Sequence, residues 1–215
     1  ILETWKRAEA AGLNTMITNN ESAHVVDAVK SYLSGGGKLQ WIAQVSFRSL
    51  PSLHVAVENV AKIGAKAMYF HGGIIDELYT KRDEKTLREH VATARSFGIR
   101  VGAAGHSPAA HEWVNDFDLV DFHVVCFYNC GSLHSGKGEK FRLADMLEAA
   151  ACTRRLKKPC IAYKIMAAGR IDPAMAFEYA FQNIKSGDVV NVGMHRGDKD
   201  DMVEENAALV QKVLA

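Results

Sequence analysis

The feature that most constrains this sequence is a regular alternation of short apolar segments with longer amphipathic ones. Seven segments have the length and composition of strands: residues 14–18, 41–46, 66–71, 100–105, 120–128, 160–167 and 189–193. Eight have the pattern of helices: residues 2–11, a segment capped within 19–22 that runs to 33, and residues 53–63, 84–97, 107–115, 141–156, 172–184 and 200–214. The predicted strands are largely apolar on both faces, which is typical of a parallel sheet buried on both sides.

Repeats of about 30 residues joined by short loops predict an α/β fold, a (β/α)8 TIM barrel that occupies residues 1–215 as a single domain. An open doubly wound sheet is the alternative, but no GxGxxG or Walker sequence follows the first strand. The opening helix has no strand before it. Because a barrel that lacks a strand leaves two bare edges, we expect its first strand to be absent from this chain.

Composition and charge exclude several classes of partner. The chain has 215 residues, 48% of them hydrophobic, and a formal net charge of +1 with scattered positive residues. We therefore expect no nucleic-acid or membrane partner, but a small-molecule substrate, and a homo-oligomer is compatible with the sequence. Four cysteines without a CxxC pair indicate reduced thiols, and no signal peptide is visible, so we expect a cytoplasmic protein.

Several segments, taken in order, resemble the aldo-keto reductases. They are residues 5–14 (helix, glycine, next strand), 67–72 (a strand that ends in a histidine), 99–107 (an "IRxxGxSxH"-like strand), and 192–194 followed by 204–206. The resemblance covers nearly the whole chain and implies a (β/α)8 barrel. It also implies NADPH-dependent reduction of carbonyl groups by an aspartate, a tyrosine, a lysine and a histidine.

The sequence departs from that family at three of the four catalytic positions. The aspartate position falls near Ile17, the lysine position carries Gln44 or Val45, and no tyrosine stands around residues 19–21. Only His71 matches. Without a tyrosine whose pKa is lowered by a lysine, the carbonyl oxygen has no evident proton donor. We therefore expect the fold of the aldo-keto reductases but not their reductase mechanism. A divalent metal is a more favoured cofactor than NADP.

Polar side chains at the carboxyl ends of barrel strands converge on one mouth. His71 and His106 end adjacent predicted strands, so two imidazoles with a carboxylate, Glu21 or Asp76, are candidate metal ligands. The alternatives are metal-free acid–base catalysis and plain hydrogen bonding to neighbouring loops. His123 lies early in its strand and is interpreted as a core histidine.

Further candidates come from the later strands and their loops. Lys164 stands within an apolar predicted strand, where it could contact substrate, pair with a carboxylate or form a Schiff base. Arg170 follows that strand and could clamp an anion. Gln44, Asn129 and His195 are candidate substrate contacts. The irregular segment 129–140 is interpreted as a surface loop or a substrate lid.

These observations favour an enzyme, of lyase, isomerase or hydrolase type, that acts on a small sugar-like or carbonyl substrate. His71, His106 and Lys164 would be catalytic, with His71, His106 and Glu21 as ligands if a divalent metal takes part. The alternatives are an NAD(P)H-dependent oxidoreductase and a non-catalytic barrel that binds a metabolite.

Overall fold

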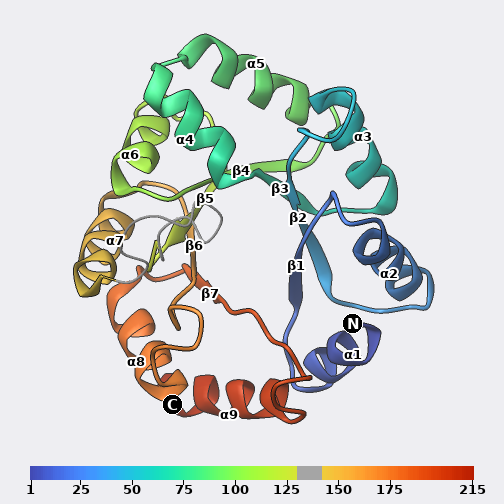
Figure 1. The fold of residues 1–215 in the computed structure, drawn as a ribbon, viewed down its shortest axis with the longest axis vertical. Helices are drawn as coiled ribbons and strands as arrows, with labels where there is room; N and C mark the ends of the chain where they lie inside the picture. Colours follow the sequence, from blue (N-terminus) through green and yellow to red (C-terminus); the bar gives the residue numbers. More distant parts are fainter. Residues whose placement is uncertain (130–141) are drawn as a thin grey trace.

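A computed structural model describes residues 1–129 and 142–215. Its sheet has seven parallel strands paired in chain order (Figure 1). The strands are β1 (Thr15–Asn19), β2 (Gln40–Val45), β3 (Ala67–Phe70), β4 (Arg100–Gly105), β5 (Phe122–Cys126), β6 (Cys160–Tyr163) and β7 (Val189–Asn191). The sheet curls into a nearly closed barrel, which confirms the predicted TIM-barrel class with one strand fewer than eight.

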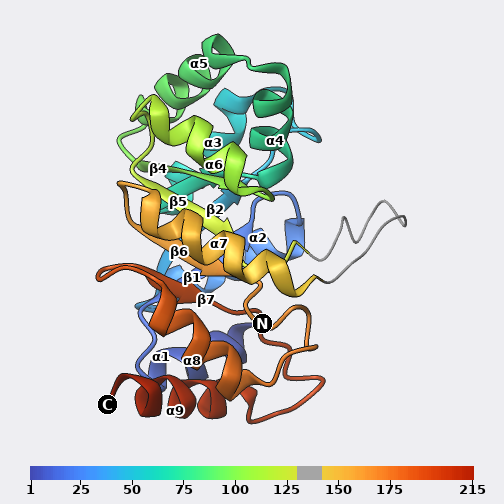
Figure 2. The same ribbon diagram turned by 90° about the vertical axis from the view of Figure 1, so that its left-hand side faces the viewer.

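Helices surround the sheet on its outer face (Figure 2). They are α1 (Leu2–Ala10), α2 (Ala23–Ser34), α3 (Leu53–Ile63), α4 (Gly72–Lys81), α5 (Glu84–Arg95), α6 (Pro108–Asp116), α7 (Leu143–Arg155), α8 (Pro173–Asn183) and α9 (Met202–Leu214). Within the described residues no helix is long and apolar enough to cross a membrane. Helix α4 was not predicted from the sequence, and the sixth strand was predicted to extend to residue 167 although β6 ends at Tyr163.

The barrel is open between β1 and β7, which are not paired with each other in the described sheet. Helices α1 and α9 lie side by side across this opening (Figure 1). Arg7 on α1 joins them, with Nε 2.6 Å from Oε1 of Glu204 and Nη1 3.0 Å from Oδ2 of Asp200. The helical layer is therefore continuous at the point where the sheet is not.

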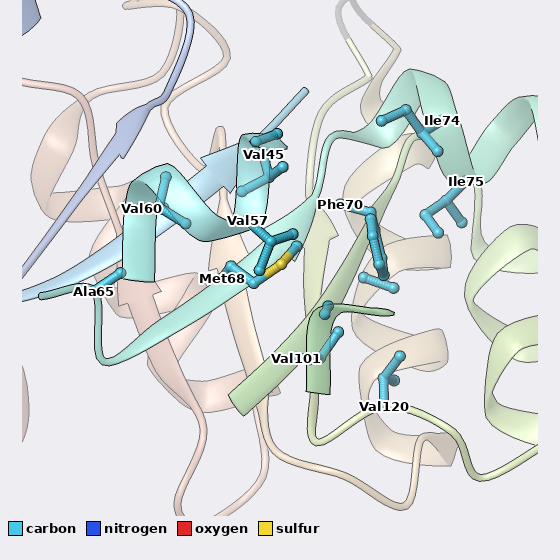
Figure 3. Packing of buried hydrophobic residues seen from close by; sticks show 14 of the residues in the cluster. Val45, Val57, Val60, Ala65, Met68, Phe70, Ile74, Ile75, Val101 and Val120 are labelled. Carbon is cyan, nitrogen blue, oxygen red and sulfur yellow. The ribbon is translucent and has the colours of Figure 1, made fainter. Parts of the chain in front are cut away.

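Alternate residues of β1 to β4 face the helices and form the larger core (Figure 3), and those of β5 to β7 pack in a second cluster. Met68 and Phe70 of β3 are fully buried there, together with Val57 of α3 and Ile75 of α4. Each such side chain contributes about 1.5–3 kcal/mol of hydrophobic stabilisation. This packing fixes the ends of β3 and β4, which carry the site described below.

The remaining residues face the lumen. Tyr69, Ala104, Phe122, Val124 and Ile161 are buried members of one lumenal cluster. The strand register aligns Gln44 with Tyr69, and Cys126 with Tyr163, toward the carboxyl end of the sheet. The lumen is thus apolar toward the amino ends of the strands and becomes polar near their carboxyl ends, at the mouth of the barrel.

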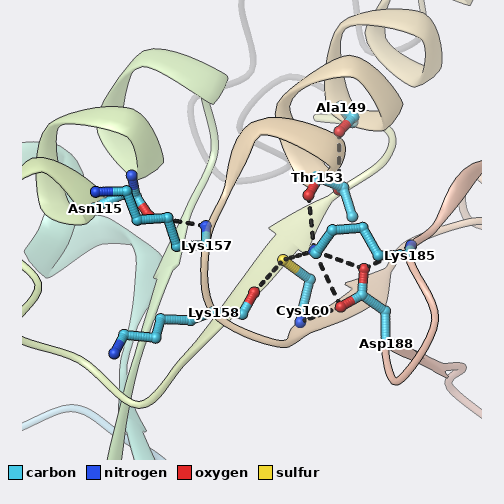
Figure 4. A network of polar contacts seen from close by, with 8 residues as sticks. All are labelled: Asn115, Ala149, Thr153, Lys157, Lys158, Cys160, Lys185 and Asp188. Atoms are coloured by element: carbon cyan, nitrogen blue, oxygen red, sulfur yellow. Dashed lines mark hydrogen bonds and ion pairs between the residues drawn. The ribbon is translucent and has the colours of Figure 1, made fainter.

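At the opposite end of the barrel, a buried ion pair anchors the start of β6 (Figure 4). Nζ of Lys185 lies 2.9 Å from Oδ2 of Asp188, whose side chain is 1% exposed. Lys185 also donates to the carbonyl oxygen of Thr153 at 2.8 Å. Oδ1 of Asp188 accepts from the backbone N–H of Cys160 at 2.8 Å and Oδ2 from that of Lys185 at 2.9 Å, so one carboxylate orders the start of β6 and the turn before β7.

Candidate functional site

The site is built on the transition from β3 to α4. His71 follows β3 directly and caps α4, its Nδ1 accepting a hydrogen bond from the backbone N–H of Gly73 at 3.1 Å. Glycine is needed at position 72, because an added Cβ would lie 2.8 Å from Cε1 of His106. Gly72 therefore allows the first turn of α4 to lie against the histidine that follows β4.

One turn into α4, Asp76 holds His106 through two contacts. Its Oδ2 lies 2.5 Å from Nδ1 of the imidazole, and its Oδ1 accepts from the backbone N–H of His106 at 3.0 Å. Because a carboxylate accepts, Nδ1 carries a proton, and in the neutral ring Nε2 keeps its lone pair. Both side chains are about one-third exposed, at 31% for His106 and 33% for Asp76. The pair is rigidly oriented and still accessible from the mouth.

His71 is held in the complementary tautomer. Its Nδ1 accepts from Gly73, so Nε2 carries the proton of the neutral ring. Burial lowers the pKa of His71, and the neighbouring His106 and Arg48 lower it further. A neutral imidazole at a helix N-terminus is a hydrogen-bond donor that can polarise a carbonyl oxygen.

The carboxylate expected beside these histidines was Glu21, but Glu21 is exposed and accepts a hydrogen bond from Ser49 at 2.9 Å. Asp76, the other carboxylate considered, is the one that contacts His106. In residues 1–129 and 142–215 no three His, Cys, Asp or Glu side chains are grouped so that they could hold a metal ion. The expectation of a metal site therefore gains no support from the geometry.

A pocket of about 270 Å³ opens beside His106. It is lined by His106, Ser107, Pro108, Cys126, Asn129, Arg142, Asp145 and Glu148. A larger hollow of about 530 Å³ lies between α8 and α9 on the outer surface of the barrel, away from its mouth. We assign the site to the smaller pocket, because it is the one that contains the oriented imidazole.

Two phenols form the polar upper layer of the lumen. The hydroxyl of Tyr69 donates to Oε1 of Gln44 at 3.0 Å. Burial raises the pKa of Tyr69, and burial together with Cys126, Tyr69 and Asp76 raises that of Tyr163 well above its usual value. Both phenols are therefore neutral hydrogen-bond donors at physiological pH. This is the reverse of the lowered pKa that a reductase tyrosine requires.

The other predicted site residues lie at different places around the mouth. Lys164 is half-buried just after β6, and Asn129 lines the pocket. Arg170 is exposed and donates to the carbonyl oxygen of Ala167 at 2.9 Å. The side chain of His195 is 77% exposed, with Nδ1 3.3 Å from Oδ2 of Asp198. The rest of the predicted lid, residues 130–140, lies outside the described residues.

Three residues of this region were not assigned to the site from the sequence: Asp76, Tyr69 and Tyr163. Asp76 was considered only as an alternative metal ligand, because α4 itself was not predicted. The two tyrosines stand at the carboxyl end of apolar strands, a position that could have identified them. His123 was interpreted as a core histidine, and its complete burial confirms this.

Comparisons with known proteins show the fold. No family model matches the chain, and no curated protein matches it. A solved structure assigned to the aldo-keto reductases of Pseudomonas aeruginosa has a TM-score of 0.68 and 13% identity over 100% of this chain and 80% of that one. An HpcH/HpaI aldolase/citrate lyase family protein from Burkholderia cenocepacia has a TM-score of 0.58 and 13% identity over 99% of this chain and 90% of that one.

A truncated 3-deoxy-D-arabino-heptulosonate 7-phosphate synthase from Thermotoga maritima is similar too, with a TM-score of 0.61 and 9% identity over 99% of this chain and 79% of that one. These neighbours are barrel enzymes of different chemistry. The aldo-keto reductase resemblance is therefore one of several barrel relationships, and the likeness establishes the fold alone.

Proposed function

We propose that this protein is an enzyme that moves a proton at a carbon next to a carbonyl or hydroxyl group of a small, polar, sugar-like or carbonyl substrate. The observation that carries this proposal is the contact between Asp76 and His106 at the mouth of the barrel. An aspartate that accepts from Nδ1 orients the ring and stabilises the imidazolium that forms when Nε2 takes a proton. The same arrangement serves as a general base in many enzymes.

His71 and His106 have different roles in the proposed reaction. Nε2 of His106 accepts the proton from carbon, while the neutral His71 donates a hydrogen bond from Nε2 to the substrate oxygen, on which negative charge develops. The proton returns from His106 to a neighbouring carbon or to a leaving group, which gives an isomerase or lyase outcome. The adjacent pocket, of about 270 Å³, suits a small substrate.

The proposal is tested by solvent exchange. The protein is incubated in D2O with dihydroxyacetone, glyceraldehyde or pyruvate, and deuterium incorporation at carbon is followed by proton NMR. We expect catalysed exchange with at least one of these compounds. We also expect a loss of about 10²–10⁴-fold in His106→Ala and Asp76→Asn, the range typical of a general base and its orienting group.

The matched control is Asp27→Asn, which makes the same change as Asp76→Asn at a residue of α2. Asp27 is exposed and pairs with Lys30 at 3.2 Å, so its replacement should leave the exchange rate unchanged. If none of the three compounds exchanges, or if His106→Ala retains the wild-type rate, the proposal is wrong.

A further inference from the structure

The loop that follows β6 has an unusual backbone. Lys164, Ala167 and Ala168 all have positive φ, at 57°, 48° and 55°, and Gly169 has a φ of 81°. The left-handed region is costly for residues other than glycine, asparagine and aspartate. Lysine and alanine have no local side-chain hydrogen bond that would offset this cost. Such clustered strain persists where the surrounding structure imposes it, and it is frequent at functional sites.

The strain at Lys164 changes where its side chain points. Tyr163 faces the lumen, so the next residue of a regular strand would face the helices. The left-handed conformation interrupts this alternation, and Nζ of Lys164 lies 5.5 Å from the centroid of the Tyr163 ring. The ammonium group is thereby held against a lumenal side chain near the mouth.

Lys164 also differs from the other half-buried cations in having no counter-ion. The other four half-buried Lys and Arg side chains of the described chain have carboxylate partners: Arg7 with Glu204 and Asp200, Lys158 with Asp118, Lys185 with Asp188, and Arg196 with Asp200. No described carboxylate pairs with Lys164. A partly desolvated ammonium without an anion is unfavourable, and a bound anion would relieve this.

We propose that Lys164 binds the carboxylate of the substrate, so that the substrate is a small oxo or hydroxy acid. This inference rests on the proposed function, since it adds a substrate class to the same mouth. One ammonium group balances one monoanionic carboxylate, whereas phosphate dianions usually take several cations or amide donors. The Tyr163 ring lies beside this ammonium group, and His106, which would act on the reacting carbon, follows β4, two strands before Lys164 in the sheet.

The test compares two substitutions in the same strained loop. Lys164→Asn removes the charge and introduces a residue that tolerates positive φ. Ala168→Asn makes the same backbone change at an exposed residue and keeps the ammonium group. Because both relieve strain, each should raise the folding equilibrium constant by about two- to fivefold, measured by urea denaturation.

Binding then separates the two variants. Pyruvate and glyoxylate are titrated by calorimetry into the His106→Ala protein, which keeps binding measurable when turnover is absent. We expect Lys164→Asn to weaken carboxylate binding at least tenfold and Ala168→Asn to change it less than twofold. Binding of the neutral glyceraldehyde should be the same in both. If Lys164 had only a structural role, Lys164→Asn would not be expected to raise stability and weaken carboxylate binding at the same time.

Four results would overturn the inference: no saturable binding of pyruvate or glyoxylate, equal binding by Lys164→Asn, tighter Lys164-dependent binding of inorganic phosphate, or a pyruvate adduct on Lys164 trapped by borohydride. The last would make the residue an imine-forming nucleophile instead of an ion-pair partner. If Lys164→Asn keeps both carbon exchange and carboxylate binding, the inferred substrate class is wrong. The proposed role of His106 is not affected by that result.

Discussion

Acidification should destabilise this protein through a buried pair of histidines behind β4 and β5. His111 of α6 and His123 of β5 are fully buried, with their Nδ1 atoms 3.2 Å apart. Nε2 of His111 lies 3.3 Å from the carbonyl oxygen of Gly105, to which it donates. Its Nδ1 therefore accepts from Nδ1–H of His123. This leaves Nε2 of His123 buried without a partner among the described residues.

Protonation of either ring is unfavourable in the folded protein. Burial lowers the pKa of His111 to about 4 and that of His123, which also faces His111, Lys185 and Lys158, to about 3. In the unfolded chain both titrate near 6.5, so below that pH the unfolded state binds more protons than the folded one. Stability is complete above about pH 6.5 and is lost as the pH falls toward 4. At pH 5 the loss is about 2 kcal/mol for each histidine.

Urea denaturation from pH 8 to pH 5 measures this effect. A total loss of about 4 kcal/mol is a large part of the 5–15 kcal/mol that stabilises a typical domain. His111→Leu/His123→Leu should flatten the pH dependence, whereas His24→Leu, at an exposed histidine, should not. Wild-type stability that is constant between pH 7 and pH 5, or a double variant with the wild-type slope, would refute the reasoning.

Three further predictions follow from contacts described above. Gly72→Ala should lower the carbon-exchange rate at least tenfold, because the added Cβ would displace the His106 ring from Asp76. Nitrogen NMR of the His106 imidazole should then show that the Nδ1–H tautomer is lost. An unchanged spectrum would contradict this prediction. Asp188→Asn should cost about 2–4 kcal/mol in urea denaturation, since it breaks the buried pair with Lys185; a cost below about 1 kcal/mol would show that this ion pair is dispensable. Amide hydrogens of β1 and β7 should exchange with D2O faster than those of β3, β4 and β5, because each of the first two has only one neighbouring strand, and equal protection would mean that the opening is closed in solution.

The barrel was predictable because its signal is repeated along the whole chain. Helix α3 and strand β4 begin and end at the residues expected, since a glycine or a capping serine stands at their ends. The missed helix α4 opens with Gly72 and Gly73, a pair that usually indicates a turn. Gly72 serves the close approach of His106, which is a contact between distant parts of the sequence.

Part of the candidate site could be proposed from the sequence. His71 and His106 were identified because they stand at strand ends, a position the sequence reveals. Their partner Asp76 was left as an alternative to Glu21, since choosing between the two requires knowing that a helix follows β3. The end of β6 at Tyr163 was not predictable, because neither Lys164 nor the alanines after it favour a left-handed backbone.

The central claim, that the imidazole of His106 is the base, is tested most directly by chemical rescue. His106→Gly should lose carbon exchange by at least about 10²-fold, and added imidazole should restore a concentration-dependent part of it, since the free base can occupy the vacated place beside Asp76. Exchange by His106→Gly at the wild-type rate, with no response to imidazole, would contradict the account.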